Sequence, residues 1–141
     1  MQDNFKYEKG YWYPHMKPRD IEIWERFIDA YPTAYDLCQY DFGIGDLPAF
    51  IKDASSKEGQ AMQELYRLKI DVLGWTAGHI DLIEVKPNAG ASAIGQVLGY
   101  VQLYKRDVVQ SVPVYPVIVT NEEKLNMRFL CEQNGVRLVV V

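Results

Sequence analysis

Residues 65–104 contain the feature that most constrains the fold: two strand-like runs separated by the dipeptide Ala77-Gly78. Both runs are rich in β-branched and apolar residues and are bounded by turn residues, which is typical of a β-hairpin. A two-residue loop at Ala77-Gly78 places opposite one another those positions whose numbers sum to 155. Asp71 and Glu84 have this sum. The sequence therefore predicts that their side chains lie on one face of the sheet, with Cβ atoms roughly 5 Å apart.

Lys86 lies two positions after Glu84, so the two side chains share a face of the second strand. Two acids and a lysine on otherwise apolar strands are costly to bury without a partner. Mg²⁺ takes oxygen ligands, usually one or two carboxylates with waters and substrate phosphate. The pattern therefore predicts a site for Mg²⁺ (or Mn²⁺) that acts on a phosphate group. The alternative is a surface hairpin in which each acid is solvated and pairs with a nearby lysine, as in most chance matches to so short a motif.

These residues resemble the PD-(D/E)XK nuclease superfamily, which has the restriction-endonuclease-like fold. In that family an acid near the end of one strand is followed by E-x-K on the next, and here Asp71 is followed by Glu84-Val85-Lys86. A helix then carries Gln96 and Tyr100, which look like the Q-x-x-x-Y signature of the branch that includes recombination-associated exonucleases. The resemblance extends over most of the chain from about residue 20 onward. One departure is Ile70, which stands where the family often has proline.

The resemblance implies a metal-dependent nuclease whose substrate we expect to be DNA. The expected ligands of the ion are Asp71, Glu84, the Val85 carbonyl and Glu25. Lys86 is expected to position or help deprotonate the attacking water, and Gln96 is expected to assist. Family members often carry a glutamate that reaches the metal from the first helix. We assign this role to Glu25 because it lies nearer the buried edge of that helix than Glu22 does; the alternative is an ordinary solvated acid.

Three further residues are candidate nucleic-acid contacts, namely Tyr100, Lys52 and Lys57. Tyr100 lies one turn after Gln96 on the same helix face, where it would brace Gln96 or touch DNA. Lys52 and Lys57 belong to a polar connection over residues 49–63, which a solvated loop explains equally well.

The remaining pattern predicts an αβββαβ core followed by a C-terminal helix and strand. The expected elements are a helix from Ile21 to about Tyr31 capped by Asp20, a strand over 34–42, the hairpin, a helix to about Arg106 capped by Ser92, a strand over 112–120, a helix to about Asn134 capped by Asn121, and a strand over 136–141. A terminal strand-helix-strand unit implies parallel pairing beside the antiparallel hairpin. We therefore expect an α/β protein, a restriction-endonuclease-like three-layer sandwich on a mixed sheet.

Two regions are expected: an aromatic and basic N-terminal arm over 1–19, and a single nuclease-like domain over 20–141. Two prolines exclude a regular helix in the second half of the arm. The arm either packs along the domain or contacts another molecule. Aromatic side chains beside Lys and Arg also suit stacking on exposed bases.

Bulk properties exclude several protein classes. The chain has no run of 18 apolar residues and no apolar region near its start, so we expect no membrane span and no signal peptide. Cys38 and Cys131 lie far apart without C-x-x-C spacing, which indicates reduced core thiols and a cytoplasmic location. A net charge of −4 argues against coating of nucleic acid by bulk electrostatics.

The expected partner is nucleic acid, with DNA preferred, and a homodimer or a larger protein complex is compatible with so small a domain. The alternative function is a catalytically inactive nuclease-fold protein that acts as a nucleic-acid-binding or assembly module. The intact D…E-x-K…Q set argues against this alternative. A third possibility is a different enzyme that uses the carboxylate pair on a small phosphorylated substrate. It is less favoured because the sequence contains no recognisable nucleotide- or sugar-binding motif.

Overall fold

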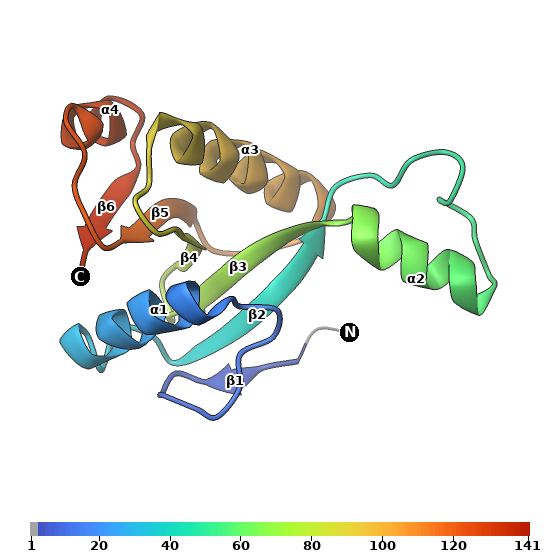
Figure 1. Ribbon diagram of the computed structural model, residues 1–141, viewed down its shortest axis with the longest axis horizontal. Helices are drawn as coiled ribbons and strands as arrows, with labels where there is room; N and C mark the ends of the chain where they lie inside the picture. Colours follow the sequence, from blue (N-terminus) through green and yellow to red (C-terminus); the bar gives the residue numbers. More distant parts are fainter. Residues whose placement is uncertain (1–2) are drawn as a thin grey trace.

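The computed structural model describes residues 3–141 and contains one six-stranded mixed sheet with four helices (Figure 1). The strands are β1 (Phe5–Lys6), β2 (Leu37–Ile44), β3 (Leu68–Trp75), β4 (Ile80–Val85), β5 (Val114–Thr120) and β6 (Arg137–Val140). The helices are α1 (Pro18–Ala30), α2 (Lys57–Tyr66), α3 (Ala91–Asp107) and α4 (Met127–Gln133). Strand order along the sheet follows the chain, antiparallel from β1 to β4 and parallel from β4 to β6. The predicted mixed sheet and element order are confirmed, with β1 and α2 as additions.

Helices cover both faces of the sheet, so the three-layer α/β sandwich is confirmed (Figure 1). On one face α1 packs Trp24 and Phe27, both fully buried, against valines and isoleucines of the central strands. On the other face α3 and α4 pack against the alternate residues of the same strands. No helix within residues 3–141 has the length and apolar character needed to cross a bilayer.

The β3–β4 hairpin has the predicted register. Trp75 pairs with Ile80, Val72 pairs with Ile83, and the loop is the dipeptide 77–78. The Thr76 N–H donates to the His79 carbonyl at 2.9 Å, while the Thr76 hydroxyl accepts the His79 N–H at 3.0 Å. These contacts fix the turn, and the turn fixes which residues of the two strands lie opposite one another.

Three helix starts differ from the sequence prediction. Helix α1 begins at Pro18, whose fixed φ suits the first helical position, so Asp20 lies inside the first turn and is not the cap. Helix α3 is preceded by Gly90, not capped by Ser92. Helix α4 begins only at Met127, because the predicted cap Asn121 instead exchanges hydrogen bonds with Asn88 in the loop after β4.

Strand β2 changes face at Asp41. This residue has a left-handed φ of 53° and is left out of the ladder, which pairs Tyr40 with Val72 and Phe42 with Ile70. Tyr40 packs on the α1 side of the sheet and Phe42 on the α3 side. Asp71 lies opposite this interruption, and within the described residues it has no ladder partner on β2.

The described part of the N-terminal arm packs on the domain. Strand β1 pairs with the edge of β2, and Tyr7 and Tyr13 are buried. Residues 1–2, which the arm was expected to include, lie outside the described residues. The polar connection over 49–63 contains the start of α2, whose first turn is capped by the Ser56 hydroxyl. Helix α2 projects from the rest of the domain, and none of its residues, 57–66, is buried (Figure 1).

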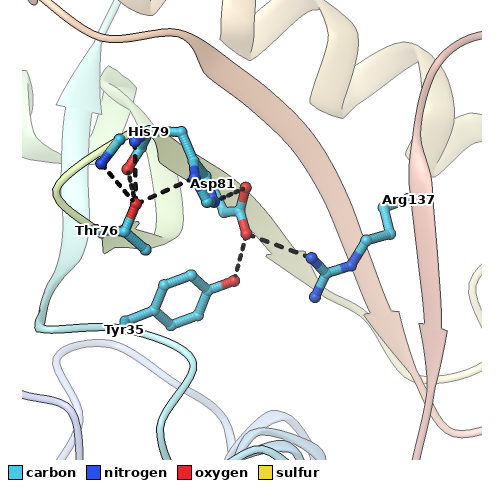
Figure 2. Close-up of polar contacts among 6 residues, drawn as sticks. Tyr35, Thr76, His79, Asp81 and Arg137 are labelled. Carbon is cyan, nitrogen blue, oxygen red and sulfur yellow. Dashed lines mark hydrogen bonds and ion pairs between the residues drawn. The ribbon is translucent and has the colours of Figure 1, made fainter.

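Asp81 lies at the turn end of the hairpin, buried in a polar network (Figure 2). Its Oδ2 accepts a hydrogen bond from the Tyr35 hydroxyl at 2.7 Å, and its carboxylate lies 3.4 Å from His79 Nε2 and 3.7 Å from an Arg137 nitrogen. Gly74 pairs with Asp81 across the hairpin, and the Tyr35 ring occupies the space that a Cβ at Gly74 would need. The network therefore ties the α1–β2 loop and β6 to the hairpin.

We expect Tyr35→Phe to lower the free energy of unfolding by about 1–3 kcal/mol, because it removes a donor from a buried carboxylate. Urea unfolding followed by circular dichroism measures this change. Tyr115→Phe is the matched control, since Tyr115 is half exposed and stands beside the same histidine ring. Equal stabilities of the two variants would contradict the assigned role of the network.

Candidate active site

A cleft of about 610 Å³ lies at the end of the hairpin opposite its turn. Its walls come from the end of the arm, the first turn of α1, β3, and the end of β4 with the residues that follow it. The lining residues are His15, Lys17, Pro18, Arg19, Asp20, Asp71, Glu84, Val85, Lys86 and Pro87. The structure therefore brings Asp71, Glu84, Val85 and Lys86 together, as the hairpin register predicts.

The carboxyl groups of Asp71 and Glu84 are adjacent, close enough for one to donate a hydrogen bond to the other when it is protonated. Asp71 Oδ2 also accepts the Val85 N–H at 2.9 Å, which fixes its orientation. Glu84 is 6% exposed, and its Oε2 is buried without any hydrogen-bond partner within residues 3–141. A buried carboxylate oxygen without a donor is costly, and a cation supplies the missing interaction.

Burial raises the pKa of Glu84 well above its ordinary value, and the neighbouring Asp71 carboxylate raises it further. The Lys86 ammonium acts in the opposite direction, which places Lys86 close to the pair. Burial also raises the pKa of Asp71, but the Val85 N–H holds that rise back. Two carboxyl groups this close cannot both ionise without a cation, so Glu84 is the member that keeps a proton in the metal-free protein.

Asp20 is a third acid at this cleft that the sequence prediction missed. Its negative charge raises the pKa of both Asp71 and Glu84, so its carboxylate lies near theirs. The signal for it was Pro18, which favours the first helical position and so places Asp20 in the first turn of α1. Within residues 3–141, no three side chains of His, Cys, Asp or Glu are grouped closely enough to hold a metal ion alone. Mg²⁺ sites commonly use only one or two carboxylates with waters and substrate phosphate.

Glu25, the residue expected to reach the ion from α1, does not line the cleft. Its Oε2 accepts a hydrogen bond from the Tyr13 hydroxyl at 2.8 Å, which fastens the arm to the helix. The three-residue difference in helix start does not matter here, because Glu25 and Asp20 are five positions apart and therefore face different directions.

Gln96, which was expected to assist catalysis, and the three predicted nucleic-acid contacts do not line the cleft. Gln96 is exposed on α3 and donates to the Tyr100 hydroxyl at 3.2 Å. Burial raises the pKa of Tyr100, and the charges of Glu84 and Asp71 add to this, so Tyr100 borders the acids from the α3 side. Lys52 lines a separate hollow beside Arg67, and Lys57 is exposed at the start of α2.

Without a divalent ion, we expect the free energy of unfolding to fall as pH rises above about 4.3, the ordinary value for glutamate. The folded protein holds the Glu84 proton more tightly than the unfolded chain does, so stability is fully present below that pH and is lost above it. Glu84→Gln should remove the contribution of this group, which is at most about 1.4 kcal/mol per pH unit. Urea unfolding in EDTA between pH 4 and 8 measures it.

Glu132→Gln is the matched control for this prediction, because Glu132 is exposed on α4 and its substitution should leave the pH dependence unchanged. The assignment would be contradicted if the free energy of unfolding rose between pH 4 and 8, and rose more in the wild-type protein than in the Glu84→Gln protein.

The chain is similar to Endonuclease NucS from Corynebacterium aurimucosum, with 27% identity over 125 residues that cover 73% of this chain and 53% of the relative. The chain thus spans about half the length of this curated relative. No family model matches the chain, and no solved structure gives a significant match. The similarity supports a relationship between this chain and a nuclease.

Proposed function

We propose that this protein is a metal-dependent nuclease that hydrolyses phosphodiester bonds of DNA. The observation that carries the proposal is the Glu84 carboxyl, which lies beside the Asp71 carboxyl at the cleft and whose buried Oε2 lacks any donor within the described residues. The similarity to an endonuclease supports the same reaction.

The residues present fit Mg²⁺ or Mn²⁺. The groups that could coordinate an ion at the cleft are the carboxylates of Asp71 and Glu84 and the backbone carbonyl of Val85, with Asp20 nearby. Hard divalent ions prefer such oxygen ligands. In our proposal the first three hold the ion, and Asp20 takes the place that Glu25 was expected to fill. When bound, the ion lowers the pKa of a water and acts as a Lewis acid on a phosphoryl oxygen.

The side chains around the acids supply the remaining functions. Lys86 borders the carboxyl pair and would stabilise the negative charge that develops on the phosphate while orienting the attacking water. Lys17 and Arg19 line the same cleft beside the first turn of α1, where cations and exposed N–H groups favour a phosphate. Gln96 and Tyr100, which are hydrogen-bonded to each other, would contact the DNA strand from the α3 side and would not orient the attacking water.

We expect Lys86→Ala to reduce DNA cleavage in Mg²⁺ about a hundredfold or more, because it removes a cation placed beside the developing charge. Cleavage is measured on gels after plasmid DNA and single-stranded DNA have been incubated with each protein in Mg²⁺. Lys105→Ala is the matched control, since Lys105 is exposed in the last turn of α3. Full activity of the Lys86→Ala protein would rule out the proposed mechanism.

We expect Mg²⁺ to raise the melting temperature, because it binds only the folded protein, with a stabilisation of about 2.7 kcal/mol at one hundred times Kd. Asp71→Asn should abolish the shift, and Asp20→Asn should weaken the apparent affinity. Glu25→Gln, the matched control on the same helix, should keep the wild-type Mg²⁺ dependence because Glu25 is bonded to Tyr13. If Glu25→Gln lost more apparent Mg²⁺ affinity than Asp20→Asn, the roles assigned to these two residues would be reversed.

A further inference from the structure

A second hollow of about 400 Å³ adjoins the cleft. It is formed by the arm, the part of β2 around Asp41, and the junction between α2 and β3. His15 lines both the hollow and the cleft, which makes them neighbours. Asp41 lines the hollow, and its charge raises the pKa of Asp71 in the cleft. A chain of nucleotides passing over the acids would therefore meet this hollow next.

Trp12 provides an aromatic surface in the hollow. Its side chain lines the hollow and is 67% exposed, although its neighbour Tyr13 is buried and hydrogen-bonded to Glu25. The backbone beside Trp12 is therefore anchored, while the indole itself contributes little to the core. Exposed aromatic rings of this kind serve as stacking platforms for nucleobases.

Arg67 provides a cation in the same hollow. Its side chain lies across β2 at Gly43, where an added Cβ would collide with Arg67 Cδ. Within residues 3–141 Arg67 makes no side-chain hydrogen bond or ion pair, whereas Lys69 in the same hollow pairs with both Asp41 and Glu64. Lys69 offsets one of the negative charges of the hollow, and the Arg67 charge, which lowers the pKa of Glu64, partly offsets the others, Asp3 included. The guanidinium donors themselves make no bond within the described residues and can bind a phosphate.

We propose that this hollow is a nucleotide-binding subsite that takes one unpaired nucleotide of the substrate strand. Its base stacks on Trp12, and Arg67 binds the phosphate next to the one at the acids. A base held in a duplex stack cannot enter a side hollow, so the subsite selects single-stranded or locally unpaired DNA. This inference rests on the proposed nuclease function, because it takes the acids as the place of the scissile phosphate.

The test compares binding of a labelled single-stranded oligodeoxynucleotide with binding of the blunt duplex of the same sequence, by fluorescence anisotropy. The background is Lys86→Ala in Mg²⁺, so that strands are bound without being cut. Adding Trp12→Ala should weaken single-strand binding about five- to hundredfold, the range found for loss of one base-stacking contact. Adding Arg67→Ala should weaken it about fivefold or more, because a phosphate contact is lost. Binding of the duplex should change by less than about twofold in both variants.

Two matched controls lie outside the hollow. Tyr11 is adjacent to Trp12 and fully exposed but does not line the hollow, and Arg26 is an exposed arginine that pairs with Glu22. Tyr11→Ala and Arg26→Ala should leave both affinities unchanged. Circular dichroism and melting temperature show whether each variant is folded.

A second readout is the tryptophan fluorescence of the protein. When single-stranded DNA is added, stacking of a base on Trp12 should quench this fluorescence. The other two tryptophans should not respond, because Trp24 is fully buried and Trp75 lies at the turn end of the hairpin, away from the hollow. Trp12→Phe keeps an aromatic platform, so it should retain affinity within about threefold but lose the quench.

Unchanged single-strand binding in Trp12→Ala, or equal losses for single strand and duplex, would overturn the subsite. If the wild-type protein still cleaves DNA in Mg²⁺, only the subsite is lost and the nuclease proposal stands. If the wild-type protein neither cleaves nor binds DNA, the nuclease proposal falls and the subsite falls with it.

Discussion

The contact between the Asp71 and Glu84 carboxyl groups is the constraint on which the rest of the site depends. Two acids this close, one of them buried with an oxygen lacking a donor, are unfavourable in isolation. They are held there by a hairpin whose register is set at the far end, by the Thr76 turn. The rigidity of the packed sheet prevents the pair from separating, so the repulsion is relieved only by a proton or by a cation.

The same hairpin carries a buried acid at each end, and the two differ in how completely they are satisfied. Asp81 has a hydroxyl donor and two basic neighbours, and this network connects three segments of the chain (Figure 2). Glu84 instead has another acid beside its carboxyl, and its Oε2 has no donor within residues 3–141. Asp81 therefore serves the fold, whereas the arrangement around Glu84 weakens the metal-free fold and creates a place for a ligand.

The hairpin and the order of elements could be predicted from sequence because they depend on local signals. A two-residue loop and alternating apolar residues determine the register of Asp71 and Glu84 without knowledge of the remaining fold. Helix starts were less predictable: Pro18 starts α1 ahead of the expected cap, and the side chain of Asn121, the expected cap of α4, is used in contacts with Asn88. The position of Glu25 outside the cleft was not predictable for a related reason: the bond between Glu25 and Tyr13 depends on how the arm folds back, which no local pattern specifies. The change of face at Asp41 likewise requires a left-handed residue that only the packed sheet stabilises.

Each strand of this sheet pairs only with its neighbours in sequence, from β1 to β6. The entropy lost on adding a strand is then set mainly by the single connection that precedes it, and no strand has to be inserted between two that are already paired. Assembly can accordingly follow the direction of synthesis on the ribosome, with the acid-bearing hairpin in place before the two parallel strands dock beside it.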